Sequence, residues 1–234
     1  MKKFLIATVV LLGSISLANA ERFSIGATVT GGVFEVDGAS ETFSGTHSSN
    51  ASATTVTINA GDEGEDAEAA VVMGSIFFEA AVNDQLSLGA SYVPHSMDSE
   101  TAENIVNIGD LPEDPGNDNE SRNTVKVTFE DLTTIYALAN LNDNVYAKVG
   151  FVQVEVITDE NLATGGAYGN TDLDGYTIAL GYSMDLADGM FVRAEASYLD
   201  LDGVSLKNSN DSTKSVKVDG ISGYGAGISV GKSF

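Results

Sequence analysis

The chain has 234 residues, of which 34 are acidic and 11 are basic, so its formal net charge is -23. This charge argues against nucleic-acid binding, because contact with phosphates needs a basic surface. The absence of cysteine excludes a disulfide framework, a thiolate zinc site and a cysteine nucleophile, and there are only two histidines. Because 43% of the residues are hydrophobic, the charge does not predict disorder.

The first 20 residues have the features of a secretory signal peptide. Two lysines precede an apolar run at 4–12, and the small residues Ala18 and Ala20 fit a cleavage site. The apolar run is too short to span a membrane as a helix. We therefore expect removal of residues 1–20, which leaves one domain at 21–234.

From residue 23 onward, large apolar residues alternate with small or polar ones, as in β-strands with two different faces. This pattern predicts eight strands, at about 23–33, 70–82, 86–92, 123–141, 145–156, 172–186, 190–202 and 220–234. The run at 123–141 keeps no single parity, so its outward face cannot be chosen without a β-bulge.

Short and long connections alternate strictly along the chain. The short turns are 83–85, 142–144 and 187–189, and the long polar loops are 37–69, 94–122, 158–171 and 203–219. All short turns and both chain ends therefore lie at one end of the strands, with all long loops at the other. This layout is typical of an all-β, eight-stranded antiparallel up-and-down transmembrane barrel, whose closed wall leaves no unpaired backbone edge in lipid.

The large apolar face is predicted to contact lipid, because a narrow lumen favours the small residues of the other face. Aromatic residues of outward parity lie at similar heights, as in the outer aromatic girdle of such barrels: Tyr92, Phe151, Tyr176, Tyr198 and Tyr224. Two alternatives stay open. One is a soluble eight-stranded barrel around a ligand, and the other is a ten-stranded barrel that uses residues 56–58.

The whole mature chain resembles the small outer-membrane barrels of Gram-negative bacteria, namely the OmpA transmembrane domain, OmpX and opacity-type surface proteins. The resemblance is most specific at the C-terminus, which is similar to the signal read by the barrel-assembly machinery: Tyr224, Ile228, Val230 and Phe234. Lys232 departs from that pattern. The resemblance implies a monomer in the cell outer membrane, in contact with lipid and lipopolysaccharide, with a structural or surface-interaction role.

Four charged residues of lumen parity are predicted to meet inside the barrel. Glu79, Lys148 and Arg193 each lie four residues from a short turn, and Glu195 lies two residues beyond Arg193. Unpaired charges in a narrow lumen are costly, so we expect a Glu79–Lys148/Arg193 network with Glu195 as a further partner. The similar cluster of the OmpA barrel implies a plug or gate. The alternatives are separately solvated charges and a narrow passive channel for small solutes.

Two Asp-Leu-Asp-Gly tetrads, at 172–175 and 200–203, flank the hairpin turn 187–189. The hairpin register places Tyr176 opposite Asp200 and Asp174 opposite Asp202. Like charges on paired strands repel, and a divalent cation relieves the repulsion. We therefore predict a calcium- or magnesium-dependent lipopolysaccharide contact at Asp174 and Asp202, with Asp172 and Asp200 nearby; the alternative is an ordinary solvated rim.

No catalytic motif emerges from the sequence. His95-Ser96 lies at a rim where lipid A-modifying barrels carry His and Ser, but catalysis needs a base, its orienting group and a nucleophile together. Gly223-x-Gly225-x-Gly227 lacks the helix of a nucleotide-binding fingerprint. The acidic runs at 62–68 and 113–120 lack the spacing of an EF-hand. We therefore predict a protein that is not an enzyme and has no cofactor beyond the calcium or magnesium ion predicted at the rim; a lipid A-modifying enzyme is the remote alternative.

Overall fold

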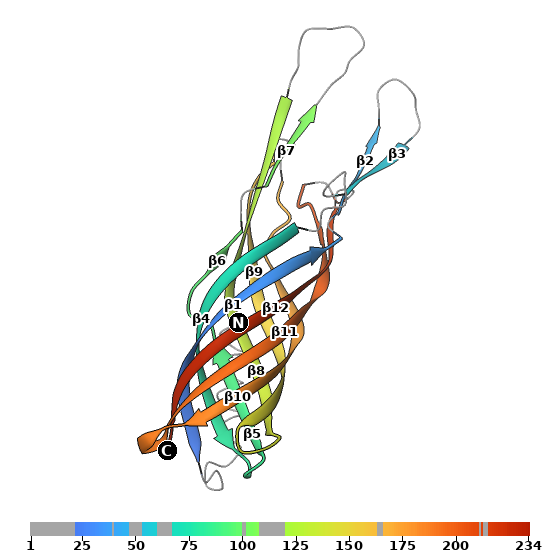
Figure 1. Cartoon of the computed structure of the whole chain (residues 1–234). Helices are drawn as coiled ribbons and strands as arrows, with labels where there is room; N and C mark the ends of the chain where they lie inside the picture. The colour runs from blue at the N-terminus through green and yellow to red at the C-terminus, as the bar shows by residue number, and fades with distance from the viewer. Residues whose placement is uncertain are drawn as a thin grey trace.

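A closed barrel of eight antiparallel strands dominates the computed structural model, which describes residues 22–38, 40–46, 53–59, 67–99, 102–107, 120–162, 166–210, 212 and 215–234 (Figure 1). The barrel strands are β1 (Phe23–Asp37), β4 (Ala67–Ala81), β5 (Leu86–Tyr92), β8 (Glu120–Asn140), β9 (Val145–Asn161), β10 (Thr171–Asp185), β11 (Met190–Lys207) and β12 (Ser215–Ser233). Each pairs with the next, and β1 pairs with β12 from Ser24↔Ser233 to Asp37↔Gly220, which closes the wall. The predicted eight-stranded barrel is confirmed.

Four shorter strands add to the end of the barrel that carries the long loops. β2 (Ser40–Thr46) and β3 (Ala53–Asn59) form a hairpin, and β6 (Met97–Asp98) and β7 (Ala102–Asn107) pair with β8. Figure 1 shows β2, β3 and β7 projecting beyond the barrel. Residues 56–58 belong to this projecting hairpin and not to the wall, so the ten-stranded alternative is wrong. No helix in the described part of the chain is long and apolar enough to cross a membrane.

Side-chain hydrogen bonds shape two of the three short turns at the opposite end. Asn83 Oδ1 accepts hydrogen bonds from the backbone N–H groups two and three residues further on, at 2.8 and 2.9 Å. Asn142 Oδ1 accepts the equivalent pair, both at 2.9 Å. The third turn is the single 3-10 turn Ala187–Gly189, in which Asp188 (φ 60°) and Gly189 (φ 74°) occupy the left-handed region. Asn, Asp and Gly are the residues that tolerate these geometries best.

The outer face of the barrel is a continuous band of exposed apolar side chains. The band includes Ile25, Val29, Val33, Val72, Ile76, Val149, Phe151, Ile178, Leu180, Tyr182, Ile228 and Val230. An apolar surface of this extent is unfavourable in water, whereas it matches the hydrocarbon of a bilayer. A closed wall with such a band is a membrane-spanning barrel, which argues against the soluble alternative.

Aromatic side chains gather at both margins of the apolar band. At the short-turn end, Phe23 stacks on Phe234 with ring centroids 4.9 Å apart, which joins the first and last strands. Toward the long loops, Tyr198 lies between Tyr176 and Tyr224, with centroids 6.4 and 5.1 Å away. Aromatic rings at these two heights are the girdles expected where a barrel meets the membrane interfaces.

A β-bulge in β8 changes which side chains face the interior. The register with β9 shifts around Asp131, which adopts a positive φ of 54°. On the short-turn side of the bulge, Tyr136 and Leu138 are buried, whereas Val127 and Phe129 pack inside on the other side. One extra residue inverts the alternation of faces, which explains why the sequence of this strand keeps no single parity.

Large aromatic side chains fill the short-turn half of the interior, each opposite a glycine on the neighbouring strand. The pairs are Phe77–Gly26, Tyr136–Gly89, Tyr146–Gly181 and Phe191–Gly231. A Cβ on any of these glycines would overlap the ring opposite, so the missing side chain provides the space that the ring occupies. The expected small residues and charges do line the lumen, but large rings lie among them, because glycines on the neighbouring strands provide the space for the rings.

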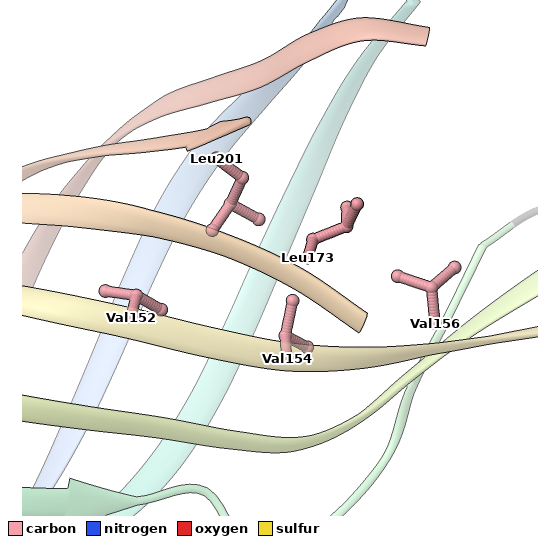
Figure 2. Packing of buried hydrophobic residues seen from close by; sticks show 5 residues of the cluster. All are labelled: Val152, Val154, Val156, Leu173 and Leu201. Atoms are coloured by element: carbon pink, nitrogen blue, oxygen red, sulfur yellow. The ribbon is translucent and has the colours of Figure 1, made fainter. Parts of the chain in front are cut away.

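The long-loop half of the interior holds an aliphatic core. Five residues of β9, β10 and β11, each at most 8% exposed, form it: Val152, Val154, Val156, Leu173 and Leu201. Figure 2 shows their side chains gathered in one space between the strands. Burial of each side chain stabilises the fold by roughly 1.5–3 kcal/mol. Because these side chains are packed and apolar, this half resembles the core of a soluble protein more than a water-filled lumen.

Candidate functional site

Four charged side chains meet inside the short-turn half of the barrel. Arg193 of β11 donates a hydrogen bond from NH1 to Glu79 Oε1 of β4 at 2.7 Å. Lys148 of β9 donates to Glu195 Oε1 of β11 at 2.5 Å. Neither pair joins adjacent strands, so both contacts cross the lumen. The structure brings the four predicted residues, here called the lumen cluster, together, with Arg193 rather than Lys148 as the partner of Glu79.

Two tyrosines complete the hydrogen bonding of the carboxylates. The Tyr136 hydroxyl donates to Glu79 Oε1 at 2.9 Å, and the Tyr146 hydroxyl donates to Glu195 Oε2 at 3.0 Å. Lys148 Nζ also lies 5.1 Å from the centre of the Tyr136 ring. Each carboxylate therefore has one cationic and one hydroxyl partner, which offsets the loss of its hydration.

Arg193 is enclosed by aromatic rings. Its guanidinium carbon lies 4.4 Å from the ring centre of Phe191, 5.3 Å from that of Tyr146 and 5.9 Å from that of Phe77. Its side chain is 15% exposed and that of Glu79 is 5% exposed. A cation–π contact shielded from water is worth about 2 kcal/mol. Arg193 Nε is buried and has no hydrogen-bond partner within the described residues.

The sequence reasoning missed the two tyrosines. Tyr146 shares the parity of Lys148 two residues further on, which places both in the lumen. Tyr136 lies in the strand whose parity was ambiguous, and only the bulge at Asp131 settles its side. A useful signal was present in the glycines, because Gly89 and Gly181 lie opposite these tyrosines in the register.

A cavity of about 120 Å³, here called the lumen cavity, adjoins the lumen cluster. Hydroxyl groups line much of its wall, from Thr28, Thr30, Ser75, Ser91, Thr134, Thr177, Ser197 and Ser229. Apolar side chains line another part, namely Val93, Leu132, Val152 and Leu199. The cavity is thus bounded by paired charges in one direction and by aliphatic side chains in the other.

The predicted rim aspartates have partners of other kinds. The register places Tyr176 opposite Asp200 as expected, and Asp200 Oδ2 accepts hydrogen bonds from the hydroxyls of Tyr198 (2.9 Å) and Tyr176 (3.3 Å). Asp174 Oδ1 accepts one from Gln153 Nε2 at 3.0 Å. Among the described residues, no three His, Cys, Asp or Glu side chains lie together as metal ligands. The structure therefore does not bring these residues together as one set of metal ligands: Asp172, Asp174, Asp200 and Asp202.

His95 contacts backbone groups through both ring nitrogens. Its Nε2 accepts a hydrogen bond from the Gly74 N–H at 3.0 Å, and its Nδ1 lies 3.2 Å from the carbonyl oxygen of Ser96. These partners fit the neutral tautomer with its proton on Nδ1. In the part of the chain that the structure describes, neither nitrogen contacts a serine hydroxyl, so the base–nucleophile contact that catalysis would need is not formed at His95.

The C-terminal residues of the expected assembly signal are all exposed on the outer face: Tyr224, Ile228, Val230 and Phe234. The predicted signal peptide, with Ala18 and Ala20, and most of the two acidic runs lie outside the described residues.

No protein-family model matches the chain, and no curated protein matches it in sequence. Among solved structures it is similar to Ail, the attachment invasion locus protein of Yersinia pestis (TM-score 0.43, 8% identity, 91% of this chain and 99% of that one). It is also similar to the outer membrane protein OprG from Pseudomonas aeruginosa (0.43, 16%, 92% and 97%) and the outer membrane protease OmpT from Escherichia coli (0.39, 9%, 92% and 97%). The closed strand order and the apolar band make the chain a small β-barrel of the outer-membrane type.

Proposed function

We propose that the chain is a monomeric barrel of the outer membrane with a structural or surface-interaction role, and that its lumen cluster plugs the lumen. The supporting observation is that two ion pairs, Glu79–Arg193 and Lys148–Glu195, form inside the lumen between non-adjacent strands. Together with Tyr136, Tyr146 and the rings around Arg193, these side chains occupy the cross-section on the short-turn side. The alternation of connections favours an orientation with the short turns in the periplasm and the long loops outside.

The outer surface suggests the partners. The apolar band and its girdles suit membrane lipid and lipopolysaccharide, and the exposed residues from Tyr224 to Phe234 suit recognition by the barrel-assembly machinery. We further propose that the chain has no catalytic activity, since both nitrogens of His95 bind backbone groups. The hydroxyl-lined lumen cavity favours one competing function, a narrow passive channel, because such walls suit water and small polar solutes.

Conductance separates the plug from the channel. Refolded protein in a planar bilayer should show only rare, small conductance steps, because ion pairs occupy the lumen. The variant Glu79→Ala/Arg193→Ala removes one pair and should open frequent, larger steps. The variant Arg22→Ala, which removes the exposed Arg22–Asp84 pair at the short-turn end, is the matched control and should behave as wild type. Steady, large conductance of the wild type that the double variant leaves unchanged would reject the plug and favour the channel.

A further inference from the structure

The barrel wall contains a seam beside β4. β5 has seven residues, whereas β4 has 15 and β8 has 21. β5 pairs with β4 only as far as Ile76↔Tyr92, and no strand of the described part of the chain pairs with β4 on that side beyond Ile76. Residues 67–75 of β4 therefore form one margin of a gap in the ladder. We call this gap, between 67–75 and 93–99, the β4–β6 seam.

The other margin of the seam follows β8 instead of β4. The Val93 N–H donates to the Leu132 carbonyl at 3.0 Å, and the Ser99 N–H donates to the Val127 carbonyl at 2.7 Å. Between them, β6 pairs with Thr128 and Phe129 of β8. Beyond Tyr92 the chain thus remains hydrogen-bonded to β8 and no longer pairs with β4.

His95 bridges the seam. Its Nε2 accepts the Gly74 N–H at 3.0 Å, in the direction where a neighbouring strand would supply a carbonyl oxygen. A Cβ on Gly74 would point outward, as the side chains of Val72 and Ile76 do, and would have this imidazole nitrogen at 3.8 Å, so the ring of His95 lies toward the outer side of the seam. One side chain therefore closes a position that a strand closes elsewhere in the wall.

The lumen cavity lies directly behind the seam. Met73 and Ser75 line it from one margin and Val93 lines it from the other, while Ser91, which pairs with Phe77, lines it on the short-turn side of the seam. On the outer surface, Val72 and Ile76 beside the seam are 73% and 54% exposed. An apolar outer surface and the cavity are thus separated at this point by a gap in backbone pairing and the ring of His95.

The lumen cluster lines the cavity toward the short turns, and the aliphatic core around Val154 and Leu201 lies toward the long loops on β9, β10 and β11. Gly74 lies nine residues from the short turn at Asn83, and the girdle residue Tyr92 lies seven residues from the other end of that turn at Gln85. The two residues are therefore at similar heights in the wall. The seam thus begins at the height of the outer girdle, where unpaired backbone groups can still reach polar head groups and water.

From these observations we propose that the β4–β6 seam is a lateral portal, latched by His95, through which small molecules with one apolar and one polar part pass between the outer leaflet and the lumen cavity. The proposal rests on the proposed placement in the outer membrane. One water needs roughly 10–15 Å³ of such space, so a cavity of about 120 Å³ accepts a single ring or a short alkyl chain. Val93, Leu132 and Leu199 supply the apolar contacts, and the hydroxyls of the wall can bond one polar group of the ligand.

Benzyl alcohol is a suitable probe, because its ring shifts the NMR signals of methyl groups that it touches. Refolded, methyl-labelled protein in lipid nanodiscs is titrated, after flotation with vesicles has established membrane insertion separately. The methyl signals of Val93, Leu132 and Leu199 should shift and saturate, whereas those of Val72 and Ile76 on the lipid side should shift in proportion to concentration. Leu199→Trp fills the cavity and should abolish the saturable shift.

The latch is tested by a matched pair of substitutions. His95→Ala removes the acceptor and should raise the exchange rate of the probe roughly five- to tenfold, the equivalent of one hydrogen bond. His95→Gln retains an acceptor for the Gly74 N–H and should stay close to wild type. The proposal is overturned if the cavity methyls show no saturable shift, or if His95→Ala exchanges the probe at the wild-type rate. Failure of the plug appears as conductance, and failure of membrane placement appears in flotation, so neither is confused with these outcomes.

Discussion

The two halves of the barrel interior are filled in opposite ways. In the short-turn half, charges from β4, β9 and β11 pair across the lumen and two tyrosine hydroxyls complete their hydrogen bonds. In the long-loop half, valine and leucine side chains of β9, β10 and β11 pack with no charge among them. Two strands, β9 and β11, thus contribute to a polar network at one height and to a hydrophobic core at another.

The two halves of the interior should respond differently to the loss of one side chain. In the polar half each charge depends on its partner, because a carboxylate that loses its cation stays buried without compensation. In the apolar half each residue contributes its own burial and packing, so a loss stays local. Substitutions in the two halves should therefore differ in size and in whether a second substitution rescues them.

The largest effect is expected from Arg193→Ala. The change leaves Glu79, 5% exposed at its side chain, without a cation, and loss of one partner of a buried pair costs about 4 kcal/mol. Urea unfolding of the refolded protein in lipid vesicles measures this loss. The double variant Glu79→Gln/Arg193→Ala should recover part of it, because it removes the unpaired charge as well.

An exposed ion pair provides the control for this prediction. Arg22 and Asp84 are paired at 2.8 Å with side chains 61% and 89% exposed, so Arg22→Ala should cost less than about 1 kcal/mol. If Arg193→Ala proves as mild as Arg22→Ala, the lumen charges are solvated separately and the two halves do not differ as argued.

The second effect concerns the aliphatic core. Leu201 is 4% exposed inside the barrel, so Leu201→Ala should leave a cavity and cost about 3 kcal/mol. Leu180 is 58% exposed on the lipid side, where lipid can fill the space. Leu180→Ala should therefore cost only the transfer contribution, about 2 kcal/mol or less. The same unfolding assay reports both values, and equal costs would mean that the long-loop half is not packed as a core.

The sequence predicted most of the wall because its signals are local. Alternation at period two marks strands, and the alternation of short and long connections fixes how they are joined. Residues such as Arg193 and Glu195 were assigned to the lumen by parity alone, and the structure pairs both. Parity is a property of a single strand, so it needs no knowledge of the fold.

What the sequence did not reveal depends on register and on non-local contact. Whether Glu79 pairs with Arg193 or Lys148 follows from strand tilt and side-chain reach across the lumen, which no single strand encodes. The aliphatic core was missed because inward residues such as Val154 look like lipid-facing ones in a sequence. The β4–β6 seam was missed because the short β5 gives no sign of which neighbour the chain follows after Tyr92.

A third, smaller effect is expected at the β8 bulge, which joins the two halves. Asp131 has a φ of 54°, a conformation that Asn and Asp tolerate and that β-branched residues strongly disfavour. Asp131→Val should therefore cost roughly 1–3 kcal/mol, whereas Asp131→Asn, which also keeps an acceptor for the Tyr92 hydroxyl, should be near neutral. Unfolding in vesicles measures both, and equal stability of the two variants would show that β8 can change parity without this backbone conformation.

The smallest effect is expected at the rim aspartates, where the structure offers the predicted cation no group of three ligands among the described residues. Asp174 and Asp202 are exposed, so salt screens their repulsion and little is gained by a bound ion. The net charge of -23 means that calcium screens the whole protein and stabilises wild type and variants alike. We therefore expect 1 mM calcium to shift the thermal midpoint of wild type and of Asp174→Asn/Asp202→Asn equally, within about 1 °C. A specific site with a dissociation constant near 10 μM would instead add about 2.7 kcal/mol at that concentration. A calcium-dependent shift of that size, present in wild type and lost in the double variant, would establish the rim site.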